Sequence, residues 1–204
     1  MTAGKSKVFI IDDEESVRRS FTLLLTSAGY LVKSYAGSKE FFEQEIYHGE
    51  GCILLDIFLN EKSGLDIQDE IKTTFPNLPV IYITGNGNIP MSVQALKKGA
   101  INFLQKPVDE QNLINSVEEA LMKSRDYVAR KITADHIKSL LSTLSPRELE
   151  IFRLIITGKL NKQIASDLNI AEHTVKIHRG NITSKLGVKS VAEMVRMAEK
   201  GGLL

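Results

Sequence analysis

Short apolar runs alternate with stretches of helical periodicity over residues 1–122, and four of these runs end in a reactive polar side chain. The four runs are VFIIDD, GCILLD, LPVIYIT and INFLQKP, whereas a fifth run, YLVKSY, carries no such residue. This alternation predicts a parallel β-sheet with crossover helices. Because ligands bind where the carboxyl ends of parallel strands meet, we expect the polar ends of the four runs to lie in one cleft.

The same pattern contains five strand–helix units, which predict an α/β doubly wound sheet. The expected strands span residues 7–11, 31–35, 52–56, 79–84 and 101–105. The expected helices span residues 14–28, 38–48, 64–74, 89–98 and 109–122. Gly29, Gly49 and Gly99 follow helical stretches, where a residue with positive φ commonly ends a helix.

Three carboxylates, a hydroxyl and an ammonium are expected at the cleft. Asp12, Asp13 and Asp56 would repel one another when ionised, because like charges raise one another's pKa. A divalent cation together with Lys106 would balance this charge, and hard oxygen ligands favour Mg²⁺ or Mn²⁺. Such a site suits phosphoryl transfer, since the metal and Lys106 would offset charge on the moving oxygens while Thr84 donates a hydrogen bond. The Asp56 carboxylate would be the attacking group and would become an aspartyl phosphate.

Each feature alone is common for structural reasons, as with two acidic residues at a helix N-terminus, but their combination is specific. The elements FIIDDEE, LLDIFLNEKSGLD, VIYITGNG and FLQKPVD resemble the receiver domain of bacterial two-component response regulators. The segment TGNGNIPMSVQALKKGAINFLQKP is most similar to the FixJ-type subgroup. The resemblance covers residues 1–122 and implies five parallel strands in the order 2-1-3-4-5.

The resemblance also implies which residues bind metal and phosphate. Asp56 would accept the phosphoryl group from a cognate sensor histidine kinase. Asp12 and Asp13 would hold Mg²⁺ together with Asp56, and the backbone carbonyl of Phe58 would be a further metal ligand. Lys106 would contact the phosphoryl group after transfer.

Two further residues take the positions of the family's conformational switch. Thr84 corresponds to the switch hydroxyl and Phe103 to the switch aromatic. Many receivers carry tyrosine at that aromatic position, so Phe103 can couple through packing but not through a phenol. The Lys106–Pro107 bond would be the cis peptide usual in the family, which sequence alone cannot show because most X-Pro bonds are trans.

The net charge of +1 is distributed unevenly along the chain. Residues 1–122 hold 11 Lys/Arg and 17 Asp/Glu, a net −6, whereas residues 123–204 hold 15 and 8, a net +7. This asymmetry indicates two domains with different partners. Residues 123–143 form a largely helical linker without Gly or Pro, which argues against a flexible tether. We expect the last helix of the first domain to end near residue 134; a dimerising coiled segment is the alternative.

Residues 144–204 predict a small all-α domain of four helices. Ser145, Pro146 and Glu148 form the capping-box pattern of a first helix. NKQIASDLNI predicts a second helix, AEHTVKIHRGNITSKLG a third that ends at Gly187, and SVAEMVRMAEKGG a fourth that ends at Gly201. The short connection between the second and third helices is typical of a helix-turn-helix.

The third helix has two faces. Val175, His178, Ile182 and Leu186 recur at a spacing of three to four and should pack in the core, with His178 hydrogen-bonded there. The opposite face carries an apolar side chain beside a lysine, which fits a helix in the DNA major groove. The DNA-contacting residues expected from this helix are Thr174, Lys176, Ile177, Arg179, Gly180 and Lys185. Lys189, just beyond the helix, is a further candidate phosphate contact.

The segments LSPRELEI, NKQIASDLNI and TVKIHRGNITSKLGV resemble the LuxR-type helix-turn-helix of NarL/FixJ regulators. This resemblance implies that Lys176 and Ile177 face bases. Some family members carry lysine where this chain has Gly180, which permits close backbone approach but supplies no side-chain contact. The whole chain is thus expected to be a DNA-binding transcriptional response regulator, activated by phosphorylation of Asp56.

The expected partners follow from this assignment. They are a histidine kinase, double-stranded promoter DNA, RNA polymerase, and a second copy of the chain paired through helix 89–98 and strand 101–105. With one cysteine, Cys52, and no signal-peptide or membrane-spanning run, we expect a cytoplasmic protein. We expect no enzyme activity beyond the chain's own phosphorylation and dephosphorylation. The opposite charges leave open whether the unphosphorylated receiver covers the DNA-binding surface.

Two other functions fit parts of the pattern. A phosphohydrolase of the haloacid-dehalogenase type also uses an aspartate nucleophile with Mg²⁺, but it usually has a second Asp two positions later, where this chain has Phe58. An interaction adaptor that never binds DNA is the second alternative. Binding to random duplex DNA distinguishes it, because phosphate contacts impose a steep salt dependence.

Overall fold

The computed structural model describes residues 6–44, 46–60, 62–85 and 89–203. The chain divides into two compact units, Met1–Ala129 and Arg130–Leu204. Within the described residues, no helix is both long and apolar enough to cross a membrane.

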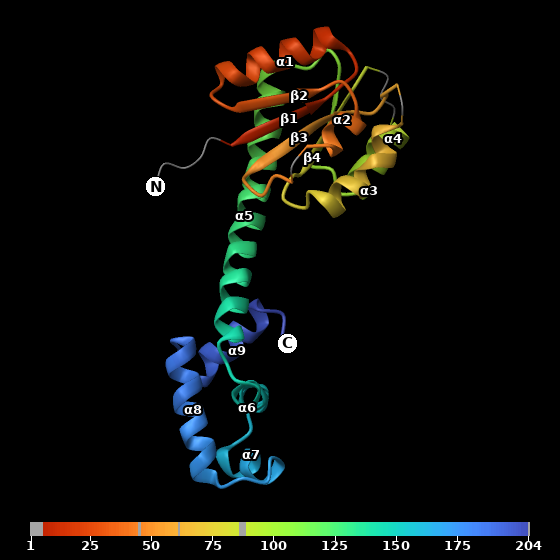
Figure 1. Cartoon of the computed structure of the whole chain (residues 1–204). Helices are drawn as coiled ribbons and strands as arrows, with labels where there is room; N and C mark the ends of the chain where they lie inside the picture. Colours follow the sequence, from red (N-terminus) through yellow and green to blue (C-terminus); the bar gives the residue numbers. More distant parts are fainter. Residues whose placement is uncertain (1–5, 45, 61, 86–88, 204) are drawn as a thin grey trace. The chain divides into compact units, whose positions relative to one another are not determined.

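The first unit is an α/β sandwich, coloured red to green in Figure 1. Its strands are β1 (Lys7–Ile11), β2 (Leu31–Tyr35), β3 (Gly51–Asp56), β4 (Val80–Thr84) and β5 (Asn102–Gln105). Its helices are α1 (Glu15–Ser27), α2 (Ser38–Phe42), α3 (Gly64–Thr74), α4 (Ile89–Lys97) and the start of α5 (Glu110–Ser142). Among the described residues, five strands form one parallel sheet in the order β2-β1-β3-β4-β5, which confirms the predicted topology.

The alternation of side chains along the strands builds a core on each face of the sheet. On one face, Phe9, Ile53 and Leu55 pack with α2, α3 and α4; on the other, Val8 and Leu54 pack with α1 and α5 (Figure 1). Every residue of β3 is buried, as its continuous apolar run suggests. Cys52 is likewise buried in the second core, and burial raises the pKa of its thiol.

Helix α2 is shorter than the prediction of residues 38–48, since it ends at Phe42. The chain beyond it is held by Asn77, whose side-chain amide donates hydrogen bonds of 2.8 Å to the carbonyls of both Tyr47 and Gly49. These carbonyls face a side chain from another segment and are not part of a helix. The prediction of a positive φ at Gly49 was also wrong, whereas Gly29 and Gly99 adopt one.

Helix α5 is longer than predicted, because it continues to Ser142 and does not end near residue 134. Its early residues Leu113 and Val117 belong to the first unit's core, whereas Ile137 and Leu141 belong to the core of the second unit. Packing of an apolar face stabilises helices more than intrinsic propensity does. The contacts at Ile137 and Leu141 therefore account for the extra turns.

The second unit adds α6 (Pro146–Ile156), α7 (Asn161–Asp167), α8 (Glu172–Leu186) and α9 (Val191–Lys200). The predicted capping box is present at the start of α6, where Ser145 and Glu148 each accept a hydrogen bond from the other's backbone N–H. Gly187 ends α8 in the left-handed region, with a φ of 65°. The turn between α7 and α8 also contains a left-handed residue, Asn169, a type that tolerates this conformation.

Candidate functional site

Four predicted site residues meet at the carboxyl edge of the sheet. Asp12 directly follows β1, Asp56 ends β3, Thr84 ends β4 and Lys106 directly follows β5. The strand order makes β1, β3, β4 and β5 neighbours, so residues far apart in the sequence share this edge. Asp12, Asp56 and Thr84 are all buried, which is uncommon for such polar groups unless they have partners.

The ammonium group of Lys106 bridges two of the buried carboxylates. Its Nζ lies 2.7 Å from Oδ2 of Asp12 and 2.9 Å from Oδ2 of Asp56. Burial lowers the pKa of Lys106, but the hydrogen bonds to these carboxylates raise it by more, so the ammonium stays charged. The backbone N–H of Lys106 also donates to the carbonyl of Thr84 at 2.8 Å. The Lys106–Pro107 peptide bond is cis.

Backbone groups orient the second oxygen of each carboxylate. The N–H of Glu14 donates to Oδ1 of Asp12 at 2.9 Å, and the N–H of Phe58 donates to Oδ1 of Asp56 at 3.1 Å. The carbonyl of Asp12 accepts a hydrogen bond of 2.7 Å from the guanidinium of Arg18, on α1. Arg18 was not predicted as part of this edge, because an arginine in a helix usually indicates only a solvated face.

The acidic cluster fits a divalent cation. Oxygen atoms of Asp12, Asp13 and Asp56 all lie within 4.8 Å of one another, and this donor set is the kind that Mg²⁺ binds. Burial raises the pKa of Asp12 more than its hydrogen bonds with Lys106 and Glu14 lower it. Three carboxylates beside the ammonium of Lys106 leave net negative charge that a divalent ion would offset. Phe58 is adjacent and forms an isolated bridge with Ser63; its carbonyl remains a predicted ligand.

The predicted switch aromatic lies beside a buried hydrogen-bond network. Phe103 is half-buried on β5, in register with Tyr82 on β4. The hydroxyl of Tyr82 donates at 3.0 Å to the carbonyl of Gly64 and contacts Oε1 of Gln68 at 3.2 Å. The amide of Gln68 in turn donates to the carbonyl of Lys98, at the end of α4. Gln68 was not predicted as part of this network, because a glutamine in a helical pattern gives no sign of burial.

Gly64 brings helix α3 against the end of β3 at very short range. A Cβ at this position would lie 2.3 Å from the carbonyl oxygen of Asp56 and 3.1 Å from the Cα of Ile57. Both are backbone atoms, so the helix or the end of β3 would have to move.

We therefore expect Gly64→Ala to destabilise the first unit by about 1–3 kcal/mol through overpacking. Tyrosine fluorescence during urea unfolding of the full chain measures this, because all five tyrosines lie in the first unit. Gly85→Ala is the matched control, since no atom of the described residues lies within 4 Å of its added Cβ. Equal stability of the two variants would contradict the close approach.

In the second unit, α8 presents the predicted face. Lys176 and Gly180 are exposed, and in the part of the chain that the structure describes no atom lies within 4 Å of a Cβ built at Gly180. Ile177 is 50% exposed, which is unusual for a large apolar side chain on a solvated helix. Thr174 and Arg179 are half-buried on the flanks of this face.

The inner face of α8 buries Val175, Ile182 and Leu186, as predicted. His178 lies with them but is only half-buried. Within the described part of the chain, its buried Nδ1 has no hydrogen-bond partner. The expected hydrogen bond at this atom is therefore not present.

Lys185, also predicted to reach phosphate, is engaged within its own domain. Its Nζ lies 2.6 Å from Oε2 of Glu148 and 3.2 Å from the carbonyl of Thr143. Lys189 lies beyond α8 and is exposed.

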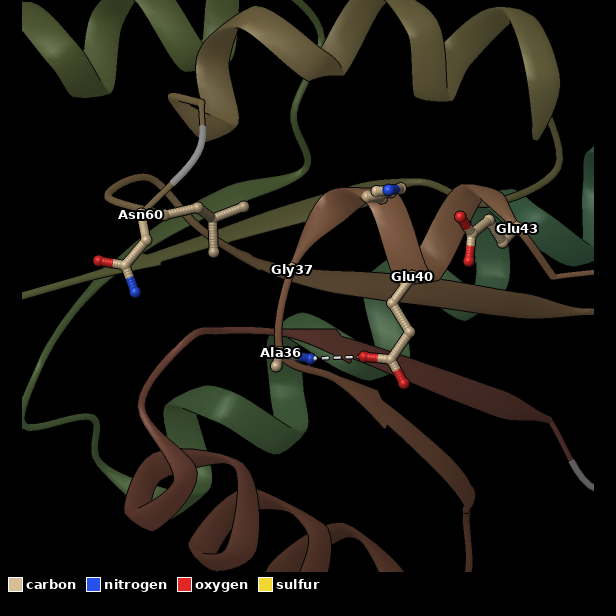
Figure 2. Close-up of a pocket in the computed structure, with 7 residues that line it drawn as sticks. Ala36, Gly37, Glu40, Glu43 and Asn60 are labelled. Atoms are coloured by element: carbon tan, nitrogen blue, oxygen red, sulfur yellow. Dashed lines mark hydrogen bonds between the residues drawn. The ribbon is translucent and has the colours of Figure 1, made fainter.

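An open hollow lies elsewhere on the carboxyl edge of the sheet (Figure 2). Its lining residues are Ala36, Gly37, Lys39, Glu40, Glu43, Leu59 and Asn60. The side chain of Glu40 lies against the backbone of Ala36 and accepts a hydrogen bond of 3.1 Å from its N–H. The lining contains none of the predicted site residues, so this hollow is distinct from the carboxylate cluster.

Both units of this chain are similar in sequence to known protein families. The response regulator receiver domain matches residues 8–118, and the luxR family of bacterial regulatory proteins matches residues 142–198. The chain is 36% identical to the transcriptional regulatory protein FixJ of Rhizobium meliloti over 198 residues, 96% of each protein. The chain belongs to the NarL/FixJ family of response regulators. The regulator is also 40% identical to nodulation protein W of Bradyrhizobium diazoefficiens over 199 residues, 98% of this chain and 88% of that protein.

Solved structures agree with this assignment. The response regulator StyR matches with a TM-score of 0.83 and 40% identity, over 97% of this chain and 100% of that one. Full-length FixJ from B. japonicum matches with a TM-score of 0.56 and 29% identity, over 98% of both chains. The regulator therefore combines a receiver domain with a LuxR-type DNA-binding domain, as transcriptional response regulators of two-component systems do. Regulators of this kind are typically not catalytic enzymes, and the absence of further activity here remains a prediction.

Proposed function

We propose that a histidine kinase phosphorylates Asp56, and that this modification promotes pairing of receivers and binding to promoter DNA. The observation that carries the proposal is the bridging of Asp12 and Asp56 by Lys106, beside Thr84, at one sheet edge. A buried nucleophile with an ammonium in contact is poised to receive an anionic group, because that ammonium can offset the incoming charge.

The chemistry assigns one task to each residue. An oxygen of Asp56 forms the new bond to phosphorus while the bond from phosphorus to the kinase imidazole breaks. Lys106 stays in contact with the phosphoryl oxygens, and the hydroxyl of Thr84 donates a hydrogen bond to one of them. Asp12, Asp13 and the Phe58 carbonyl would hold Mg²⁺ or Mn²⁺ with Asp56. The bound ion supplies positive charge that offsets the negative charge of the transferred group.

Phosphorylation would then act through packing. It adds about −1.5 to −2 charges and strong acceptor oxygens at Asp56, and it draws Thr84 and Lys106 toward the new group. Phe103 packs against the same core as Ala95 of α4, so a shift of the strand ends changes how α4 is supported. Phe103 carries no hydroxyl, and the coupling therefore depends on its packing.

Helix α4 offers the surface for pairing. Ile89, Val93 and Leu96 are 79%, 44% and 48% exposed, and their spacing places them on one face of the helix. Such an apolar stripe is costly to leave in water and favours a partner surface. We propose that two phosphorylated receivers pair through α4 and β5.

Helix α8 would bind the DNA major groove. Ile177 can contact a thymine methyl, and Lys176 can donate to a base edge. Thr174 and Arg179 are suited to phosphates. A dimer would present two such helices to half-sites about one helical turn apart. RNA polymerase as a further partner and the cytoplasm as the location belong to the same proposal.

Lys176→Ala is expected to weaken specific DNA binding by about 1–3 kcal/mol and to relax specificity at one position in each half-site. Binding to a panel of single-base variants of the site measures both effects. Lys200→Ala removes a matched charge from an exposed position on α9 and should leave the pattern of specificity unchanged. A uniform loss across all sequences would make Lys176 a phosphate contact instead.

The decisive experiment measures genome-wide DNA binding and oligomeric state with and without a phosphoryl donor. Phosphorylation should convert monomers into dimers and enrich specific sites. An interaction adaptor would bind no specific duplex. Any residual association with DNA would lack the steep salt dependence that phosphate contacts impose.

A further inference from the structure

One buried carboxylate in the DNA-binding domain, together with the lysine that it binds, contacts three segments of the chain. Glu148, in the first turn of α6, is only 4% exposed. Its Oε2 accepts hydrogen bonds from the N–H of Ser145 at 2.8 Å and from Nζ of Lys185 at 2.6 Å. Nζ of Lys185 also donates to the carbonyl of Thr143 at 3.2 Å.

These contacts join three helix ends. Thr143 directly follows α5, Ser145 caps α6, and Lys185 lies in the last turn of α8. The last turn of the DNA-binding helix is thus held against the connection between α5 and α6.

The energetics make Lys185 important to this junction. A buried carboxylate is destabilising without a charged partner, and removing one partner of such a pair costs far more than breaking an exposed ion pair. The hydrogen bonds from Lys185 and from the N–H of Ser145 hold the pKa of Glu148 below its usual value. The ammonium of Lys185 and the N–H of Ser145 therefore both stabilise the charged form of the Glu148 carboxylate.

We propose that Lys185 is a positioning residue that sets the orientation of α8, and that it is not a contact to DNA phosphates. The proposal rests on the proposed function of α8 as the DNA-binding helix. It revises the expectation that Lys185 contributes to the electrostatic part of DNA affinity. Lys176 and Lys185 are both exposed, but the ammonium of Lys185 contacts the buried carboxylate of Glu148.

The salt dependence of DNA binding separates the two roles. For the phosphorylated full chain on its specific site, Lys185→Met should lower affinity about tenfold through misplacement of α8, within the range known for substitutions that do not touch the ligand. The slope of log affinity against log salt should stay that of the wild type. A lost phosphate contact would instead reduce the slope by about 0.9 for each bound chain. Lys200→Met controls for the loss of one surface charge.

Glu148→Gln tests the same ion pair by neutralising its acidic member. It removes no positive charge, yet it should reproduce the loss of affinity. The double variant should bind no more weakly than the worse single variant, because both remove one interaction. Wild-type affinity for Glu148→Gln, or additive losses in the double variant, would overturn the proposal.

Lysine footprinting of the wild type tests the proposal without any variant. With a lysine-acetylating reagent, Lys185 should be modified at the same rate with and without DNA, whereas Lys176 should become protected. Protection of Lys185 by DNA would overturn the proposal. Failure of the wild type to bind any duplex would contradict the proposed function instead, so the two failures are distinct.

Discussion

Asp56→Asn is expected to fold normally and to lose phosphorylation completely. The amide is a poor nucleophile, and it removes one negative charge from the site where Asp12, Asp13 and Asp56 lie within 4.8 Å. It also removes the ionic contact with Lys106, now 2.9 Å long. The measurement is the amount of acid-stable, alkali-labile acyl phosphate formed from acetyl phosphate or a kinase.

Asp66→Asn is the matched control for this experiment. Asp66 is exposed on α3, so its replacement should leave phosphorylation at the wild-type level. Far-ultraviolet circular dichroism establishes that both variants are folded. Acyl phosphate on the Asp56→Asn protein would show that another carboxylate is the acceptor.

Lys106→Ala is expected to separate phosphorylation from dimerisation. Lys106 contacts both Asp12 and Asp56 and is the cation best placed to follow the phosphoryl group. Mg²⁺ binding should be intact or slightly tighter, because one competing positive charge is gone. Dimer formation on phosphorylation should be lost, since the group that senses the phosphoryl oxygens is absent.

Light scattering with a phosphoryl donor, together with Mg²⁺ titration, measures these two effects. Lys39→Ala removes an exposed lysine from α2 and should dimerise like the wild type. Normal phosphorylation-dependent dimerisation of Lys106→Ala would exclude Lys106 from the switch.

The site at the carboxyl edge was predictable because strand ends can be recognised in the sequence, and the sheet topology then places them together. In a parallel sheet, the residue after each strand lies at the same edge. Asp12, Asp56, Thr84 and Lys106 therefore had to approach one another once the strands were identified. The ends of helices were predictable where a local signal decides them, as at Ser145 and Gly187.

The positions that sequence analysis missed depend on partners far away in the chain. Gln68 is satisfied in the interior because the hydroxyl of Tyr82 donates a hydrogen bond to it and the carbonyl of Lys98 accepts one from it. Helix α2 ends at Phe42, and the carbonyls of Tyr47 and Gly49 beyond it bind the side chain of Asn77. Neither contact can be inferred from the local pattern of apolar residues.

The sequence by itself thus determined the class of each unit, the strand and helix order, and the residues of the acidic cluster, because periodicity and strand ends are local properties. Only the tertiary structure decided that α5 continues to Ser142 and that Lys185 pairs with Glu148. A lysine in a helix that faces DNA has the same local signal whether it reaches a phosphate or a buried carboxylate. The tertiary packing that brings Glu148 of α6 beside Lys185 of α8 makes the choice.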